Sequence, residues 1–426
     1  MSEQMSVRKI LVLGASGLIG RFVTGDLRAQ GFHVIGIARR YPPSQKTDAL
    51  DLEMPLMSMD SAALARLIWE HDMDVVVNCL GVLQDGPGSD TGAVHRDFVD
   101  RLLDAIRGTG RAIRLIHISI PGATNDDRTA FSMTKREAER MIAATGIAYA
   151  ILRPGFVIAP SAYGGSAMLR ALAAFPIDLP KAESATPFQP VAVEDIASTI
   201  AWLASRDSND KAASAVAWDM MQPQPVTLGG VIEQFRRAFG TSNIPRIKLP
   251  VLLLDLGARL GDLASWPGWM PPMRTTAISE LRRGVTGDPQ PWMTATGIVP
   301  KTLAQAIGQR SATIQDKWFA RLYLIKALVI SYDAAAGILT AHGFPPALVA
   351  SVTILTSLMD MTIGALIAFR RSCAFGLIAG IMASLGYMLG AAILTPDLWI
   401  EPLGALVKTG PAIVLMLVAL LTLDNR

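Results

Sequence analysis

Along the first part of the chain, short apolar runs alternate with stretches in which apolar residues recur at the three- and four-residue spacing of a helix. The apolar runs predict strands at 10–13, 33–38, 48–52, 74–79, 113–119 and 148–152, and the helical spacing predicts helices between them, among them 62–71 and 94–107. Strands that alternate with helices pair in parallel and are covered on both faces. The pattern therefore predicts a doubly wound α/β sheet.

Three glycines follow the first apolar run, at Gly14, Gly17 and Gly20. Gly14 allows a tight turn from strand to helix, Gly17 lets the main chain approach a diphosphate, and Gly20 lets helix and strand pack closely. The diphosphate would lie at the positively polarised N-terminus of the helix. A tight turn without a ligand can carry the same glycines, but the continuing strand–helix alternation favours dinucleotide binding. The other residues expected in this turn are Ser16, Leu18 and Ile19.

The ends of the later strands carry further candidate binding residues. Arg39 and Arg40 follow the second strand, where an acidic residue would bind the ribose 2′-hydroxyl of NAD. Arginine accommodates the 2′-phosphate instead, so we expect NADP(H) in preference to NAD(H); the alternative is two solvated arginines. Asp51 is placed where a carboxylate could meet the adenine. Leu80 and Gly81 follow strand 74–79 at the carboxyl edge of the sheet, where open α/β sheets bind ligands.

Together these features resemble the short-chain dehydrogenase/reductase superfamily over about residues 7–310. The similarity is to the extended or atypical branch, which includes isoflavone-reductase-like proteins, the nucleotide-binding accessory subunit of respiratory complex I and NAD-dependent epimerases/dehydratases. The motifs that carry it, besides the glycine turn, are Asn78-Cys-Leu-Gly81, Ser119, Lys135, Arg153-Pro-Gly155, Pro190-Val-Ala-Val-Glu-Asp195 and Leu281-Arg-Arg-Gly-Val-Thr-Gly-Asp288. The resemblance implies a Rossmann sheet, a cofactor contact at Pro154, and a small substrate lobe beyond it.

The resemblance also implies a catalytic pattern, from which this chain departs at one position. In catalytic members a tyrosine four residues before a lysine is the general acid/base, the lysine holds the nicotinamide ribose, and a serine orients the substrate carbonyl. Ser119 and Lys135 match the serine and the lysine, but Phe131 stands in the tyrosine's place. A phenyl ring has no ionisable proton, and general acid/base catalysis contributes about 10²–10⁴-fold.

Three interpretations of this departure remain open. A neighbour such as Thr134, or Lys135 itself, supplies the proton; the substrate needs no such proton; or the site binds nucleotide without turnover. Each matched residue also has a simpler interpretation. Ser119 could be an ordinary loop residue, and Lys135 could only form a helix-surface pair with Glu139, four residues on.

Beyond the first strands, the segment 246–270 is unusual because leucines crowd between basic residues, among them Arg246 and Lys248, and the tryptophans Trp266 and Trp269. It is typical either of a core helix or of a helix lying on a bilayer, since basic flanks and tryptophans suit the headgroup region. The predicted domains are 1–245 for the Rossmann domain with elements of the lobe, 246–318 for the rest of the lobe, and 319–426 for a membrane domain.

Four apolar segments end the chain, at 319–341, 346–369, 373–394 and 403–423. Each has the roughly twenty residues needed to cross about 30 Å of hydrocarbon. Lysine and arginine lie beside alternate ends of the segments, which predicts a multi-pass protein of the cell (inner) membrane with the Rossmann domain and both termini in the cytoplasm. Asp333 and Asp360 lie within the first two segments and either build a polar site or join helices.

This C-terminal quarter resembles the DoxX-like family of four-helix membrane proteins, through its four spans and the entry sequence Asp316-Lys-Trp-Phe-Ala-Arg-Leu-Tyr323. The resemblance implies a link to quinone or redox processes. Hydrophobic residues make up 51% of the chain, and the excess is concentrated after Trp318.

The composition excludes several classes of function. The net charge is +3 with no basic stripe, so no nucleic-acid partner is expected. Two cysteines, Cys79 and Cys373, form no disulfide framework and favour a reducing compartment. No residue pattern indicates a metal site, and we expect no signal peptide because the polar N-terminus leads directly into the first strand.

The sequence thus predicts a membrane-anchored, NAD(P)H-binding oxidoreductase that acts on a lipophilic substrate such as a quinone or isoprenoid. Its expected partners are that substrate or a membrane redox partner, and the bilayer itself. The alternative is a catalytically silent NADPH-binding module that stabilises or regulates a membrane redox assembly. A third hypothesis, an epimerase/dehydratase-like isomerase, is disfavoured because Phe131 removes the usual base.

Overall fold

The structure, a computed structural model, describes most of the N-terminal part of the chain and three C-terminal helices. The described residues are 8–42, 46, 48–86, 89–161, 164–208, 210, 212–243, 245–265, 273–308, 340, 345–368, 372–394 and 405–422. The chain divides into two units, Met1–Ile325 and Lys326–Arg426, and each is described by itself.

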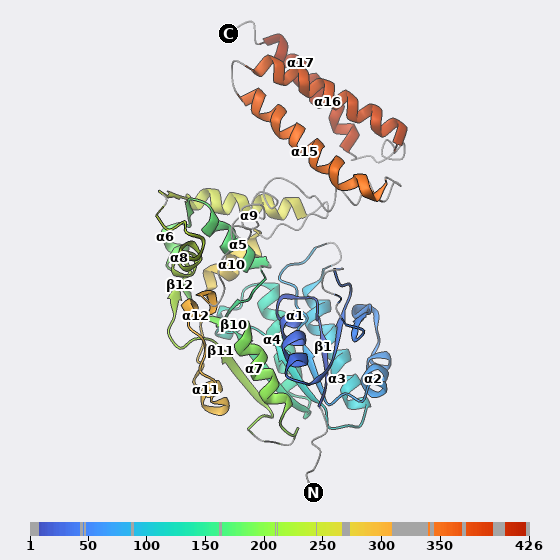
Figure 1. The fold of residues 1–426 in the computed structure, drawn as a ribbon, viewed down its shortest axis with the longest axis vertical. Coiled ribbons are helices and arrows are strands. Elements are labelled where there is room, and N and C mark those ends of the chain that lie inside the picture. The colour runs from blue at the N-terminus through green and yellow to red at the C-terminus, as the bar shows by residue number, and fades with distance from the viewer. Residues whose placement is uncertain are drawn as a thin grey trace. The chain divides into compact units, whose positions relative to one another are not determined.

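The N-terminal unit is built on a seven-stranded sheet in which all strands are parallel (Figure 1). The strand order is β11–β6–β5–β4–β1–β2–β3. The strands are β1 (Lys9–Leu13), β2 (His33–Ala38), β3 (Asp51–Glu53), β4 (Val75–Asn78), β5 (Arg114–Ile118), β6 (Ala148–Pro154) and β11 (Val216–Met220). This is the doubly wound Rossmann arrangement, whose ligand crevice lies where the chain order reverses, between β1 and β4.

The predicted strands are confirmed, and the third departs most from its predicted range because it begins at Asp51. Residues 48–50 form a turn in place of strand, because the Asp51 N–H donates to the carbonyl of Asp48 and the Asp48 N–H donates back to the Asp51 carboxylate. The central strands are apolar and buried along nearly their whole length, as strands covered on both faces must be.

Helices cover both faces of the sheet (Figure 1). One apolar core joins the sheet to α1 (Leu18–Ala29) and α7 (Val193–Ala204). The other joins it to α2 (Ser61–Glu70), α3 (Phe98–Gly108) and α4 (Ala130–Ala143). Directly before α3, residues Ala93–Asp97 form a π-helical turn, η2. Such turns are rare and often lie at functional sites.

The small lobe predicted beyond Pro154 has its own apolar core, which includes Phe188, Leu228 and Phe235. Its short strands pair as β7 with β10, β9 with β12, and β8 with β13. Their bounds are β7 (Phe156–Ile158), β8 (Ile177–Asp178), β9 (Pro187–Phe188), β10 (Pro190–Ala192), β12 (Val226–Thr227) and β13 (Ile247–Lys248). The helices are α5 (Gly164–Ala174), α6 (Lys181–Ser184), α8 (Leu228–Phe239), α9 (Val251–Ser265), α10 (Thr275–Arg283), α11 (Gln290–Thr296) and α12 (Leu303–Gly308).

Three long helices are described in the C-terminal unit: α15 (Pro346–Ala368), α16 (Cys373–Leu394) and α17 (Ala405–Thr422). Two of them contain windows long and apolar enough to cross a membrane, Ala347–Gly364 and Cys373–Gly390. The three helices coincide with the second, third and fourth predicted apolar segments. Nearly all of the first predicted span, with Asp333, lies outside the described residues.

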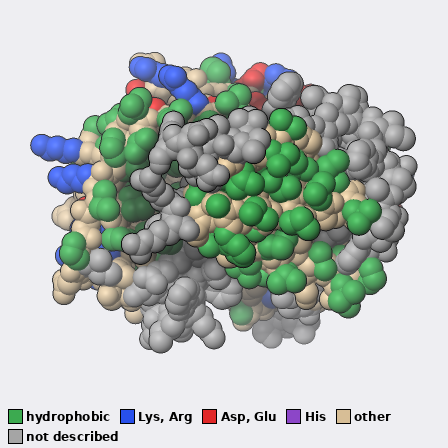
Figure 2. Space-filling view, turned by 90° about the horizontal axis from the view of Figure 1, so that it is seen from above, with side chains coloured by type: hydrophobic (Ala, Val, Ile, Leu, Met, Phe, Trp, Pro, Cys, Tyr) green, Lys and Arg blue, Asp and Glu red, His purple; other side chains and the backbone are tan. Residues whose placement is uncertain are grey.

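Large apolar side chains on these helices are exposed, among them Leu355, Phe375 and Leu389. Figure 2 shows a broad face on which hydrophobic side chains gather with few charges between them. Inside the unit, the hydroxyl of Tyr387 on α16 donates to the carboxylate of Asp360 on α15 across 2.9 Å. Asp360 therefore joins two helices, which is one of the two roles that the sequence left open for it.

Candidate nucleotide-binding and catalytic site

The turn between β1 and α1 has the geometry that its glycines predict. Gly14 has a φ of +80°, and its N–H donates to the carbonyl of Ile37 on the neighbouring strand at 2.8 Å. A Cβ added to Gly20 would lie 2.3 Å from the carbonyl oxygen of Gly14. Gly14 thus allows the left-handed turn, and Gly20 allows the helix to begin directly against it.

The N-terminus of α1 is open to an anion. Gly17 is the N-cap, no side chain caps the helix, and the first turn holds no acidic residue. Among the described residues, the main-chain N–H groups of Leu18 and Ile19 have no acceptor. Unpaired amides at a helix N-terminus are a ready anion site. The half-buried Ser16 lies in the same turn. These groups fit the diphosphate of a dinucleotide.

Replacing Gly17 by leucine tests this assignment with little effect on the fold. A Cβ at Gly17 would meet a single atom within 4 Å, the Gly14 carbonyl oxygen at 3.3 Å, so the added side chain projects into the space in front of the helix. We expect NADPH affinity to fall by at least about tenfold, with the unfolding temperature of the nucleotide-free protein unchanged. Calorimetric titration with NADPH measures the affinity.

The matched control is Gly108→Leu, because Gly108 also has open space around it but ends α3. This variant should bind the nucleotide like the unsubstituted protein. Equal affinities for the Gly17 and Gly108 variants would contradict a diphosphate at this turn.

The residues expected at the adenosine end are divided between surface and core. Arg39 and Arg40 are exposed just past the end of β2, as the expectation of a 2′-phosphate contact requires. Asp51 is buried, and its carboxylate forms an ion pair with Arg28 at 2.9 Å. Its contact with adenine stays a prediction, and the ion pair is a role that the sequence did not indicate. The buried hydroxyl of Tyr41 lies nearby and has no partner among the described residues.

Lys135, Ser119, Leu80 and Gly81 come together at the carboxyl ends of β4 and β5. The Lys135 ammonium donates to the carbonyls of Ile118 at 2.8 Å and Leu80 at 3.2 Å, and it lies 3.6 Å from where a Cβ on Gly81 would stand. Burial lowers the pKa of Lys135 from 10.5 to about 8. The Ser119 hydroxyl is buried and faces the Glu139 carboxylate, whose ionised form it helps to stabilise. A buried ammonium that uses two of its three N–H groups fits a ligand that supplies a third acceptor.

The interpretation of Lys135 as a helix-surface partner of Glu139 is wrong. Glu139 is buried and accepts two hydrogen bonds from Arg153, at 2.8 and 2.6 Å. Burial opposes ionisation, but the Arg153 hydrogen bonds and the nearby Arg136 hold the pKa of the Glu139 carboxyl below its usual value. This network fixes α4 to β6, so the position of Lys135 is set by buried contacts. Pro154, the other predicted contact, is buried at the end of β6.

His95 is a site residue that sequence reasoning missed. It lies in the π-helical turn η2, is buried, and packs edge-on against Phe131 with ring centroids 5.6 Å apart. Its Nε2 accepts from the Val82 N–H at 3.1 Å, so Nδ1 carries the hydrogen and donates to the Thr134 hydroxyl at 2.9 Å. Burial, reinforced by the charge of Lys135, lowers the pKa of His95 to about 2. His95 is therefore neutral, and both of its nitrogens are engaged.

This arrangement also decides the role of Thr134. The Thr134 hydroxyl accepts from His95 and donates to the carbonyl of Ala130 at 2.7 Å. Its hydrogen is already used within the helix, so of the two candidate proton sources only Lys135 has an N–H to spare. An ammonium has three N–H groups, and the described structure engages two of them with carbonyls. No cluster of metal-binding side chains occurs among the described residues.

The parallel sheet, its strand order and the glycine cradle define a Rossmann protein of the NAD(P)-binding, extended short-chain dehydrogenase/reductase class. Comparison with known families agrees. Residues 10–211 match the NAD dependent epimerase/dehydratase family, and residues 319–417 match the DoxX-like family. The chain thus has an N-terminal Rossmann domain of the epimerase/dehydratase family and a C-terminal DoxX-like domain. The latter, with its apolar helices, indicates association with a membrane.

Two curated relatives are an oxidising and a reducing enzyme. The chain is 28% identical over 110 residues to a dTDP-6-deoxy-L-talose 4-dehydrogenase (NAD(P)(+)) of Kitasatospora kifunensis, covering 26% of this chain and 34% of that protein. It is 29% identical over 196 residues to a 3-diazoavenalumate denitrifying reductase of a Streptomyces species, covering 39% of this chain and 62% of that protein. The chain therefore spans about a third and about three fifths of the lengths of these relatives.

Solved structures share the fold. WbmH of Bordetella bronchiseptica, in complex with NAD⁺, matches with a TM-score of 0.53 at 14% identity, covering 71% of this chain and 97% of that one. UDP-glucose 4-epimerase of Thermotoga maritima, with UDP-glucose, matches with a TM-score of 0.53 at 15% identity, covering 75% and 99%. At such identities the likeness shows the fold alone.

Proposed function

We propose that this chain is a membrane-anchored oxidoreductase that uses NADP(H) in preference to NAD(H) and acts on a lipophilic substrate such as a quinone or isoprenoid. The observation that carries the proposal is the buried Lys135 ammonium, which the carbonyls of Ile118 and Leu80 hold at the carboxyl edge of the sheet with one N–H to spare. The same chain holds the open helix N-terminus of α1 and a DoxX-like domain.

The bound nucleotide would supply or accept the hydride, and the chain's residues do the rest. The amides of Leu18 and Ile19 hold the diphosphate, and Arg39 and Arg40 meet a 2′-phosphate. Lys135 holds the nicotinamide ribose through its third N–H. The Ser119 hydroxyl, which faces the Glu139 carboxylate in the free protein, turns to donate to the oxygen of the substrate.

The source of the proton that the substrate receives needs a separate explanation, because the Phe131 ring has no ionisable proton. His95 is neutral with both nitrogens engaged, and Thr134 has donated its hydrogen to a helix carbonyl. Lys135 is the remaining group of the site that can exchange a proton near neutral pH, since burial brings its pKa to about 8. We assign it the proton transfer that the tyrosine performs in related enzymes.

A lipophilic substrate follows from the membrane anchor. Tethering a catalytic domain to a bilayer raises its encounter rate only with molecules that share the bilayer or its surface. We include in this proposal the topology expected from the loop charges, with the Rossmann domain and both termini in the cytoplasm.

One observation favours a second function, a catalytically silent NADPH-binding module in a membrane redox assembly. Phe131 fills the usual acid's position and packs against a neutral His95, which leaves an apolar contact where proton transfer would occur. Such a site can still hold a nucleotide, since the glycine turn does not involve this position.

One experiment separates the two functions. The protein is purified in detergent, any bound nucleotide is identified, and NADPH oxidation is followed with a panel of quinones and aldehydes. Oxidation that depends on Lys135 should decline as the pH rises through about 8, because the ammonium then loses its proton. In a Lys135→Arg variant the guanidinium stays protonated. Its oxidation rate should therefore not decline over this pH range, even if the rate itself is lower.

The matched control is Lys9→Arg, because Lys9 forms an exposed ion pair with Asp72 at 3.0 Å. Its pH profile should equal that of the unsubstituted protein. Bound nucleotide with no oxidation across the panel would instead support the silent module. A rate independent of pH between 7 and 9 would rule out Lys135 as the proton donor.

A further inference from the structure

Helix α9 presents most of its leucines to solvent. Leu254 and Ala258 are buried against Ile278 of α10, and a Cβ on Gly261 would lie 2.1 Å from the carbonyl oxygen of Met273, so one side of the helix is packed tightly. Five leucines, 48–76% exposed, lie on the opposite side. They are Leu252, Leu253, Leu256, Leu260 and Leu263. We call this side the α9 face. A solvated helix face would be polar.

The acidic residues of α9 are turned away from this face and neutralised. Asp255 forms an ion pair with Arg282 at 2.7 Å, and Asp262 forms one with Arg274 at 3.0 Å. These pairs anchor the helix to α10 and the segment before it. The exposed charged residue on α9 itself is Arg259, so the outward side is apolar with a positive edge.

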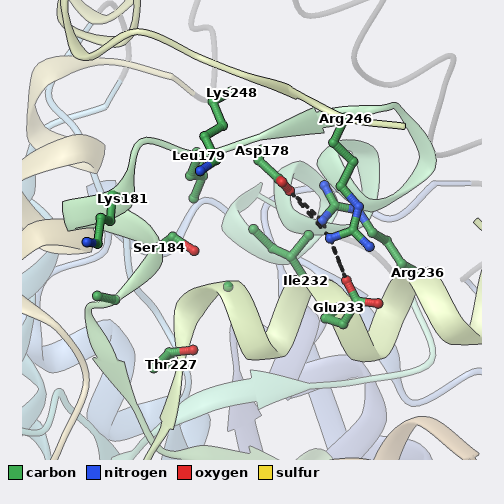
Figure 3. Close-up of a pocket in the computed structure, with 12 residues that line it drawn as sticks. Asp178, Leu179, Lys181, Ser184, Thr227, Ile232, Glu233, Arg236, Arg246 and Lys248 are labelled. Carbon is green, nitrogen blue, oxygen red and sulfur yellow. Dashed lines mark hydrogen bonds and ion pairs between the residues drawn. The ribbon is translucent and has the colours of Figure 1, made fainter. Parts of the chain in front are cut away.

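A basic pocket lies beside the start of α9. It has a volume of about 380 Å³ and is lined by residues of α6, α8 and the segment that leads into α9. Figure 3 shows Lys181, Lys248 and Arg246 around it. Arg236 pairs with Asp178 at 2.6 Å and Arg246 pairs with Glu233 at 3.0 Å, whereas Lys181 and Lys248 have no ion-pair partner among the described residues. The pocket therefore keeps unneutralised positive charge.

We propose that the α9 face and this basic pocket together dock the lobe on a membrane that contains anionic phospholipids. The leucines enter the boundary between headgroups and acyl chains, and Lys181 and Lys248 bind the phosphate groups. An apolar helix side flanked by basic residues is the pattern of helices that lie in this interface. The same chain carries apolar helices of membrane-spanning length, so a bilayer is the surface at the highest local concentration.

This inference goes beyond the proposed function, because docking requires neither bound nucleotide nor turnover. An anionic bilayer would cover the leucines and also neutralise the basic pocket. A second copy of the chain would cover the leucines but leave the pocket without a counter-charge. The experiment therefore asks whether lipid or another copy of the chain lies next to Leu256.

The test uses the full chain in lipid nanodiscs with a fluorescent probe on Leu256→Cys. The control carries the probe on Glu70→Cys, an exposed position on α2. The unsubstituted chain, with Cys79 and Cys373, sets the labelling background. With lipids that carry a shallow nitroxide and one third phosphatidylglycerol, the probe at 256 should be quenched at least about twofold more than the probe at 70.

A second experiment tests whether the two lysines contribute to docking. Lys181→Glu with Lys248→Glu should lower the quenching in phosphatidylglycerol nanodiscs to the value found in pure phosphatidylcholine. Both lysines are exposed, so the fold should survive, and an unchanged unfolding temperature verifies this. Equal quenching at positions 256 and 70 overturns the proposal. Energy transfer between copies labelled at 256, without nitroxide quenching, overturns it in favour of self-association.

Discussion

Replacing Gly20 by alanine should disrupt the turn between β1 and α1 and lower the free energy of unfolding by about 1–3 kcal/mol, the usual cost of overpacking. The added methyl would lie 2.3 Å from the carbonyl oxygen of Gly14 and 2.9 Å from its carbonyl carbon. Both atoms belong to the main chain, so no side chain can move aside. The helix must shift, and the amides of Leu18 and Ile19 shift with it. NADPH binding should therefore weaken together with stability.

The control is on the same helix. Gly25 is exposed, and a Cβ there would meet nothing within 4 Å. Gly25→Ala should raise the free energy of unfolding by about 0.5–1 kcal/mol, because alanine is the better helix former. Thermal unfolding in detergent, with and without NADPH, measures both variants. A Gly20→Ala protein as stable as the Gly25→Ala protein would mean that α1 does not begin this close to the turn.

The larger loss of stability is expected for Arg136→Leu. Arg136 is buried in α4, where it forms ion pairs with Asp127 at 3.0 Å and Glu139 at 3.1 Å. It also donates to three consecutive main-chain carbonyls, those of residues 120, 121 and 122. Leucine removes the donor from the carbonyls of residues 120 and 122, and it leaves Asp127 only with Arg283 and Glu139 only with Arg153. Breaking a buried ion pair in this way costs about 3–5 kcal/mol.

The pH dependence provides a second readout of the same substitution. The pKa of Glu139 is below its usual value of 4.5 in the folded chain, so its network stabilises the fold above that pH. This stabilisation is lost as the pH falls through the folded pKa. Without Arg136 the folded pKa rises toward the unfolded one, so the network has less stability to lose and the acid loss of stability should be smaller.

Arg140→Leu is the matched control, because Arg140 lies one turn further along α4 and is exposed. Surface substitutions of this kind change stability by no more than about 0.5 kcal/mol. Thermal unfolding between pH 4 and 7 compares the two variants. If both lose the same stability, the buried network contributes nothing beyond the helix itself.

Much of the Rossmann fold could be predicted, because its signals are local. A buried parallel strand is apolar along its length. The glycines of the turn themselves permit the positive φ and the close approach of helix and strand that the turn requires. The strands and the turn follow from these signals. The lobe core and the C-terminal helices were expected for the same reason. Lys135 was expected only from the family resemblance, and its contact with the Leu80 carbonyl depends on packing between distant parts of the chain.

Other features depend on partners distant in the chain. The ion pair of Asp51 with Arg28 and that of Arg153 with Glu139 join residues on different elements, and no spacing in the sequence marks them. His95 is a similar case: a histidine in a predicted helix has no visible role until a π-helical turn directs it to Val82 and Thr134.

By itself the sequence determined that this chain builds a nucleotide cradle at the first strand–helix turn, because three glycines within seven residues set that turn without help from elsewhere. The sequence also showed that Lys135 occupies the position of the family's lysine and that Phe131 replaces its tyrosine. Only the tertiary structure decided that His95 is neutral, that Thr134 has no proton to give, and that α9 turns its leucines outward. Those properties depend on burial and on hydrogen-bond partners, which exist only once β4, β5, α4 and α10 have packed.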